Sequence, residues 1–278
     1  MTNTHGVEVV VNELRDELSR WGVGVPFSLK RRDPREPGRK QKEESEDALF
    51  ALFMRQFRKQ TKGIRDMLKL VAPDRKAITD RPVSFYFDYL DDDFWVDEDF
   101  IANVARLFTK AAKQGIVLFD SAIGLSMDYT LTNVEAAKWA AEYSYELIKG
   151  INKTSTKALQ TIFKTFIDTP GMTIGDLVNM LPYTEARALN IAITETTRIY
   201  AEAEQLAGQA LKKEYPDVKI IVTWWTNMDP PRLCEFCAAL HGEEIEQDEY
   251  FEGALMGPPA HVGCRCWITI TTRLAEDA

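Results

Sequence analysis

Apolar residues recur at intervals of three and four along most of the chain before residue 214, and this spacing predicts a series of amphipathic helices. Gly and Pro residues separate the helical stretches. The short apolar run 83–87 is compatible with a strand. We expect seven helices. The first covers 7–21, the second begins near Ser45, and the third follows the acidic residues ahead of Phe100. The others run from Thr132 to near Gly150, over the apolar stripe 158–167, from Thr173, and over 185–213.

The stretch 185–213 is expected to be the longest helix, with Thr184 as its cap. Its apolar face is rich in alanine, which predicts a close helix or sheet neighbour. Glu195 and Arg198 are placed on the opposite side, where they can pair across one helical turn.

The spacing of apolar residues changes to two in the last quarter of the chain. Alternation in 218–224 and again in 266–271 predicts two strands that pair antiparallel on either side of a loop. The expected fold class is therefore α+β, a mainly helical body followed by a small antiparallel β module. We divide the chain into an N-terminal amphipathic helix and basic flexible arm (1–43), a helical body (44–182) and a C-terminal module (183–278).

The composition is that of a folded, acidic protein, with 45% hydrophobic residues, a formal net charge of −9 and a pI of about 5.1. This charge argues against tight, non-specific DNA binding over the whole surface, because contacts with phosphates require net positive patches. No apolar run approaches the roughly 20 residues that cross a bilayer. The first residues lack the basic region and apolar run of a signal peptide. We therefore expect a cytoplasmic protein without a membrane segment.

A basic segment contrasts with this acidic composition. Seven basic residues lie between Lys30 and Lys42, and Pro34, Pro37 and Gly38 prevent one continuous helix there. One interpretation is a solvated linker. The other is an arm that carries the first helix to a partner, with the basic stretch touching acidic protein or nucleic acid.

All four cysteines of the chain lie in one stretch together with a histidine. Cys-x-x-Cys followed by a later return of further ligands is the spacing of a metal site. In the return, the alternation of an extended chain would place two sulfurs on the same side. Five candidates compete for four tetrahedral positions, and the sequence does not choose among them. We call these five residues the Cys/His clamp and expect it to hold a structural zinc: Cys234, Cys237, His261, Cys264 and Cys266.

Other interpretations of the cysteines fit less well. Two disulfides would require an oxidising compartment, and a redox Cys-x-x-Cys usually lacks a second cysteine pair. Both remain alternatives to zinc. The zinc deaminase signature requires His-x-Glu ahead of Pro-Cys-x-x-Cys, an order that this chain lacks. A calcium loop in the acidic stretch 91–99 would need a glycine and a final glutamate that are missing there.

The last third of the chain resembles a known family, the phage Mu protein F-like minor head proteins. The resemblance covers roughly residues 183–273. It rests on the helical motif 187–196, Trp224, Asp229, the Cys234–Cys237 pair, Leu240-His241-Gly242 and the stretch 258–266, which follow the family's order. Two positions depart from its pattern. Ile193 stands where the family usually has arginine, which bears against a family salt bridge on that helix. Ala260-His261-Val262-Gly263 varies the usual Pro-x-His-Pro-Asn but retains the candidate ligand.

The resemblance implies a structural minor head protein of a tailed bacteriophage and not an enzyme. Such proteins lie in few copies inside the head near the portal and help head assembly or genome delivery. The resemblance therefore implies a virion component that assembles in the host cytoplasm. Its implied partners are portal, capsid or scaffold proteins, with weak contact to packaged DNA through the basic arm 30–42.

The alternative from another class is a metal-dependent hydrolase or nuclease, or a toxin that carries the same module. Its candidate chemistry would be Asp229, His241 and Glu195 near the metal. A catalytic zinc keeps one position open for water, whereas five available ligands favour a closed site. The chain also lacks a glycine-rich phosphate loop and a Gly-x-Ser-x-Gly motif.

Overall fold

A computed structural model of the chain describes residues 32–71, 81–90, 92–95, 97–125, 127–227 and 234–274. The expected helix 7–21 lies outside these residues, as does Asp229. None of the helices in the described ranges combines the length and the apolar character that crossing a membrane requires.

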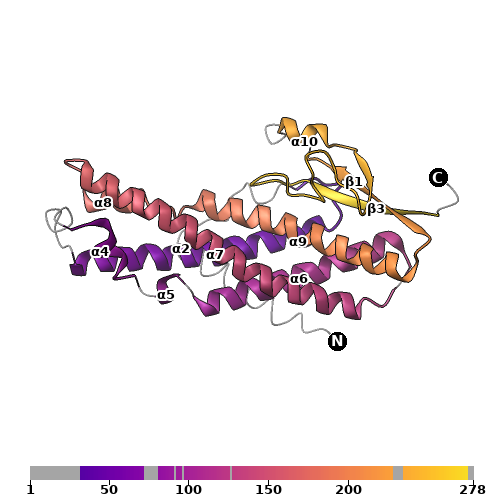
Figure 1. The fold of residues 1–278 in the computed structure, drawn as a ribbon, viewed down its shortest axis with the longest axis horizontal. Coiled ribbons are helices and arrows are strands. Elements are labelled where there is room, and N and C mark those ends of the chain that lie inside the picture. The colour runs from indigo at the N-terminus through magenta and orange to yellow at the C-terminus, as the bar shows by residue number, and fades with distance from the viewer. Residues whose placement is uncertain are drawn as a thin grey trace. The chain divides into compact units, whose positions relative to one another are not determined.

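Helices make up most of the described residues, and the strands follow the last long helix (Figure 1). The expected α+β fold, a mainly helical body followed by a small antiparallel β module, is confirmed. The helices are α2 (Arg39–Val71), α4 (Val83–Phe87), α5 (Asp92–Trp95), α6 (Glu98–Ile123), α7 (Thr130–Asp168), α8 (Ile174–Asn179), α9 (Glu185–Glu214) and α10 (Glu235–Ala239). The strands are β1 (Val218–Trp225), β2 (Glu244–Glu246) and β3 (Trp267–Leu274).

The central strand of the sheet is β1, which lies between β2 and β3. It pairs antiparallel with both, so that Val222 lies opposite Ile245 on one side and Ile270 on the other. The ladder between β1 and β3 ends with Trp225 opposite Trp267, one residue after Cys266. The two strands expected from alternation are therefore present and antiparallel, and the sheet brings the return segment of the Cys/His clamp back to the end of β1.

The described residues fall into two compact units whose boundaries lie inside the four long helices α2, α6, α7 and α9. The expected division into consecutive segments 1–43, 44–182 and 183–278 follows motif and composition and stays a prediction. Unit 1 combines the described residues within 1–51, 105–142 and 189–278, and unit 2 combines those within 52–104 and 143–188.

In unit 1, α9 has the close neighbour that its alanine content predicts. Ala192, Ala203 and Ala207 are buried, and Gly115 of α6 lies against Ala203. Trp224 of β1 is fully buried, with its ring centroid 5.2 Å from that of Phe251. Large aromatic groups and small helix residues together fill this core.

The core of unit 2 is aromatic. The ring centroids of Phe53 and Phe100 lie 5.2 Å apart in an edge-to-face pair, and Tyr86 stacks on Phe163 at 5.2 Å. Tyr86 belongs to α4, so the short run 83–87 is a helix and the expected strand is wrong. A five-residue apolar run does not distinguish the two structures by periodicity, and the packing of Tyr86 decides here.

Two helix lengths also differ from expectation. The helix that opens near Thr132 does not end at Gly150, because α7 continues through that residue to Asp168. A glycine inside a helix costs only about 1 kcal/mol relative to alanine, which the packing of a long helix overcomes. At 39 residues α7 is longer than α9, which has 30. The cap of α9 is as expected, since the Thr184 hydroxyl accepts from the Arg187 amide at 3.2 Å.

The basic segment 30–42 is not a solvated arm over its described part. Arg32 and Lys42 are each only 3% exposed, and α2 already begins at Arg39. The Arg32 guanidinium donates to Glu36 at 2.6 Å and to Glu46 at 2.9 Å. Glu36 and Glu46 therefore neutralise part of the positive charge that was expected to contact acidic protein or nucleic acid.

Candidate metal centre

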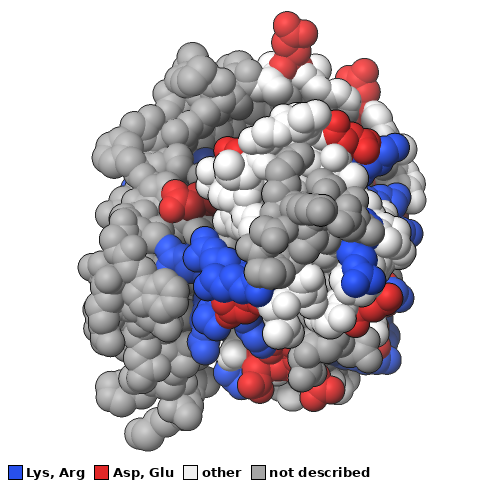
Figure 2. Space-filling model, turned by 90° about the vertical axis from the view of Figure 1, so that its left-hand side faces the viewer, with Lys and Arg blue, Asp and Glu red and all other residues white. Residues whose placement is uncertain are grey.

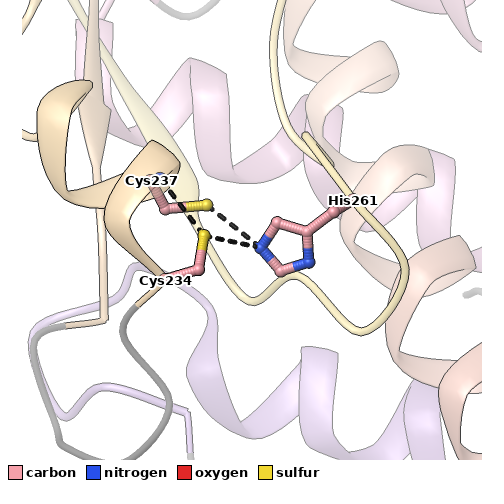
Figure 3. Close-up of side chains that lie close together, drawn as sticks. All are labelled: Cys234, Cys237 and His261. Atoms are coloured by element: carbon pink, nitrogen blue, oxygen red, sulfur yellow. Dashed lines mark hydrogen bonds between the residues drawn. The ribbon is translucent and has the colours of Figure 1, made fainter.

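The short helix α10 brings the first two cysteines together. Cys234 is its N-cap residue, and the Cys234 Sγ accepts a hydrogen bond from the Cys237 amide at 3.2 Å. A sulfur in this position replaces the oxygen that a Ser or Asp cap would supply. The three-residue spacing then places both sulfurs on the same side of the turn, where they point toward His261 (Figure 3).

The His261 ring lies against both sulfurs. Its Nε2 is 3.2 Å from the Sγ of Cys234 and 3.1 Å from the Sγ of Cys237. Its Nδ1 is 2.9 Å from the Val262 carbonyl oxygen. This contact favours a proton on Nδ1, which leaves the Nε2 lone pair facing the sulfurs. Histidines that bind metals commonly show this arrangement, with the second nitrogen donating to a backbone carbonyl.

The return segment supplies a second group of ligands. The ligand atoms of Cys237, Cys264 and Cys266 all lie within 4.8 Å of one another, and all three residues are buried. The ligand atoms of Cys234, Cys237 and His261 meet the same distance limit. Cys237 belongs to both groups, so the structure brings all five residues of the Cys/His clamp around one sulfur.

The thiols of this cluster influence one another's ionisation. Hydrogen bonds from Cys237 and Cys266 hold the pKa of the Cys264 thiol well below its usual range, and the same contact with Cys264 raises the pKa of Cys237. Burial lowers the pKa of His261, but the Val262 carbonyl and the charges of Cys264 and Cys234 outweigh burial and raise it overall. The cluster thus stabilises the thiolate of Cys264, the form in which a cysteine binds metals, while the same hydrogen bonding disfavours the Cys237 thiolate.

The distances around His261 are close to those between two ligands of one tetrahedral metal ion. Zinc–sulfur and zinc–nitrogen bonds of about 2.3 and 2.0 Å place neighbouring ligand atoms about 3.6 Å apart. The observed contacts of 3.1–3.2 Å around the His261 Nε2 differ from this by only ~0.5 Å. All four cysteines are free, so no disulfide joins them. These Cys/His groups could hold a metal.

Threonine hydroxyls hold the backbone of the clamp. On α9, the Thr194 hydroxyl accepts from the Gly263 amide at 2.8 Å, and the Thr197 hydroxyl donates to the Cys264 carbonyl at 2.9 Å. After β1, the Thr226 hydroxyl donates to the Cys237 carbonyl at 2.5 Å. Sequence reasoning missed these residues. The signal was the Thr194–Thr197 run in a helix, since threonines rarely gather in a helix without a use for their hydroxyls.

A cavity of about 290 Å³ adjoins the cluster. Among the described residues, its lining includes no Asp or Glu, and apolar side chains share it with the clamp and a few amide and hydroxyl groups. The lining consists of Leu189, Asn190, Ile193, Thr226, Asn227, Cys237, His261, Val262, Gly263, Cys264, Arg265 and Cys266.

Of the three residues named for an enzyme, the two that the structure describes, His241 and Glu195, do not join the groups that could hold a metal. The His241 Nδ1 accepts from the Thr226 amide at 3.1 Å, and its ring packs 5.4 Å from that of Trp225, which fixes the turn after α10. Glu195 is buried instead of exposed, and its carboxylate lies 3.4 Å from Arg198. Asp229 lies outside the described residues.

Of the comparisons with known proteins, the one with protein-family models gave a match. Neither the curated proteins nor the solved structures gave a match. A family model, that of phage Mu protein F like protein, matches residues 134–269. This range includes α9, β1, β2, the first residues of β3 and all five residues of the clamp. Residues 134–269 of the chain are therefore similar to the phage Mu protein F like family, as the motifs in the sequence led us to expect.

Proposed function

We propose that the chain is a structural minor head protein of a tailed bacteriophage that acts in head morphogenesis near the portal. The observation that carries the proposal is the match to the phage Mu protein F like family, with the whole Cys/His clamp inside the matched residues. The family suggests a phage head morphogenesis protein. We propose in addition that the protein lies near the portal and takes part in DNA packaging or delivery.

Within this role, the clamp binds one structural zinc through four of Cys234, Cys237, His261, Cys264 and Cys266. The supporting observations are the free thiols, the short distances between them and the orientation of the His261 ring. A closed zinc site contributes binding free energy directly to folding. Here the zinc would join α10 to the segment that leads into β3. The three-stranded sheet is small, so the zinc would add stability that the sheet alone does not supply.

The proposed role is structural and not catalytic. Four further candidate ligands lie around Cys237, which favours four protein ligands over a site that keeps a position for water. The described lining of the adjoining cavity offers no carboxylate as a general base. The cavity itself is the observation that favours a metal-dependent hydrolase as the second candidate function.

The proposed partners are portal, capsid or scaffold proteins, and the proposed location is the interior of the head after assembly in the host cytoplasm. Contact with packaged DNA through residues 30–42 would depend on the basic side chains that remain exposed, such as Arg35. On the face shown in Figure 2, acidic and basic side chains are interspersed, which favours protein partners over a DNA-binding surface there.

Location in particles tests the main proposal. Heads purified from a phage that encodes this chain, with an epitope tag at its C-terminus, should contain the protein in a few copies per particle, and portal protein should co-purify with it before DNA is packaged. A phage without the gene should yield fewer complete heads. Heads that lack the protein at every stage of assembly, with unchanged yield, would contradict the proposal.

X-ray absorption spectroscopy of the zinc-loaded protein separates the two candidate functions. Four sulfur or nitrogen ligands from the chain and no oxygen ligand support the structural role. Three protein ligands and one water-derived oxygen at the cavity support the hydrolase.

A further inference from the structure

Arg265 lies between two cysteines of the clamp, and its side chain reaches a different part of unit 1. Its guanidinium is 3.4 Å from the Oε2 of Glu46 on α2, with the Glu46 side chain fully buried and that of Arg265 only 9% exposed. In an extended segment, neighbouring side chains point to opposite sides. Sulfurs at 264 and 266 that face an ion therefore direct the intervening arginine away from it, toward Glu46.

The other oxygen of Glu46 holds the N-terminal segment. Its Oε1 accepts from the Nε of Arg32 at 2.9 Å and lies 2.8 Å from the second guanidinium nitrogen. Both side chains are fully buried. The Glu46 carboxylate thus joins Arg265, which lies between two residues of the clamp, to Arg32, the first described residue of the chain.

A second route connects the same two places. Arg32 donates to the Thr197 hydroxyl at 2.9 Å, and that hydroxyl donates to the Cys264 carbonyl at 2.9 Å. The clamp and Arg32 therefore share two buried links, one through Glu46 and one through Thr197. Because the groups are buried, loss of one partner leaves charge or a donor without compensation.

Residues 32–38 follow Arg32 in a compact path. Glu36 accepts from Arg32 at 2.6 Å and lies 3.1 Å from the Lys42 ammonium, and its amide bonds to the Asp33 carbonyl at 3.0 Å. Gly38, with φ of +65°, lies directly against Leu118 of α6. The segment therefore packs into unit 1 through the same buried charges that contact the clamp.

We propose that the metal in the clamp fastens residues 32–38, and with them the point from which the first 31 residues depart, to the rest of unit 1. This inference rests on the zinc clamp proposed above. With the ion bound, Cys264 and Cys266 fix the backbone of Arg265, so its guanidinium stays at Glu46. Without the ion, the backbone around Arg265 is held by hydrogen bonds such as those of Thr194 and Thr197, and the position of the guanidinium at Glu46 is less fixed.

Hydrogen exchange followed by mass spectrometry on the zinc-loaded full chain tests the link. The test variant is Arg265→Met, which removes the guanidinium but no metal ligand. The matched control is Arg273→Met on β3, whose guanidinium pairs with Glu244 at 3.1 Å in a half-exposed position. The amides of residues 33–39 should exchange roughly tenfold faster in R265M, which still binds one zinc, and at the wild-type rate in R273M.

Chelation of the wild-type protein gives a second reading that needs no variant. Removal of zinc should speed exchange in residues 33–39 while the α6 residues 105–123 stay protected. If R265M does not fold, Arg265→Gln, which retains a polar side chain but removes the charge, replaces it with the same expectation.

The outcomes separate the two proposals. Protein that binds no zinc overturns the clamp and this inference with it. Suppose that the protein binds zinc, but residues 33–39 exchange as slowly in R265M as in the wild type, or as slowly after chelation as before. Either result overturns this inference alone.

Discussion

Gly115 on α6 lies so close to Ala203 on α9 that a β-carbon added to the glycine would stand 2.7 Å from the Ala203 Cβ. The same added atom would lie 3.3 Å from the Tyr200 carbonyl oxygen. The helix backbones therefore approach each other more closely than two alanines permit. This contact explains why the face of α9 carries small residues where a long helix usually carries leucine.

Gly115→Ala should lower the free energy of unfolding by about 1–2 kcal/mol, because the overpacking exceeds the gain of up to about 1 kcal/mol in helix propensity. Gly150→Ala in α7 is the matched control, since nothing lies within 4 Å of its added β-carbon. It should raise stability by up to about 1 kcal/mol. Urea denaturation measures both. Equal shifts in the same direction would contradict the close contact.

Cys237→Ser should abolish zinc binding, because Cys237 is the residue shared by both ligand groups. We expect about one zinc per chain in the wild type and a fall in Tm on the order of 10 °C in the variant, since structural zinc contributes to folding. Cys234→Ser is the comparison, as Cys234 is half-buried and belongs to one group only; it should retain zinc more weakly. Metal analysis and thermal melts with and without chelator check both. A full equivalent of zinc in Cys237→Ser would exclude its role.

Glu204 should make stability depend on pH. Burial raises the pKa of this carboxyl from 4.5 to about 7, against the opposing charge of Lys42. The folded state binds the proton of Glu204 more tightly than the unfolded state does. The contribution of Glu204 to the free energy of unfolding is therefore highest below pH 4.5. It falls as the pH rises toward 7, by at most about 3 kcal/mol, and then stays level.

Comparison of unfolding free energies between pH 4.5 and 8 isolates this effect. Glu204→Gln should remove this part of the slope, whereas Glu142→Gln, at an exposed pair with Lys138, should leave it in place. Identical profiles for the wild type and Glu204→Gln would show that folding does not raise the pKa of Glu204.

Arg32→Met should destabilise the chain by about 3–5 kcal/mol, because it leaves Glu36 and Glu46 buried without their main cation. Arg35→Met, three residues away, should leave the unfolding midpoint almost unchanged, as the Arg35 side chain is 65% exposed. Chemical denaturation of the two variants under the same buffer measures the difference. Similar midpoints would place Arg32 in solvent.

Local patterns predicted the elements that depend on long, regular periodicity. The alanine-rich helix α9, the alternating strands β1 and β3 and the cap at Thr184 follow from neighbouring residues alone. The run 83–87 was misassigned because five residues carry too little periodicity, and the stacking of Tyr86 on Phe163 comes from far along the chain.

In the candidate site, too, local spacing predicted some residues, whereas contacts between distant parts of the chain could not be predicted. Spacing was enough to predict that the five residues of the clamp lie close together, because cysteine and histidine have few other reasons to gather in one stretch. Arg265, Thr197 and Glu46 could not be found in this way. Their contacts join residues as far apart as 219 positions, and common residue types carry no signal of such pairing.

The buried Glu46 limits where the chain can be shortened. A protein that began at residue 44 would retain this carboxylate and Glu204 while lacking Arg32 and Lys42, the cations that face them from the preceding residues. Such a truncation would bury uncompensated negative charge and would be expected to aggregate on expression. Any recombinant version designed for crystallisation or for binding assays should therefore begin at or before Arg32.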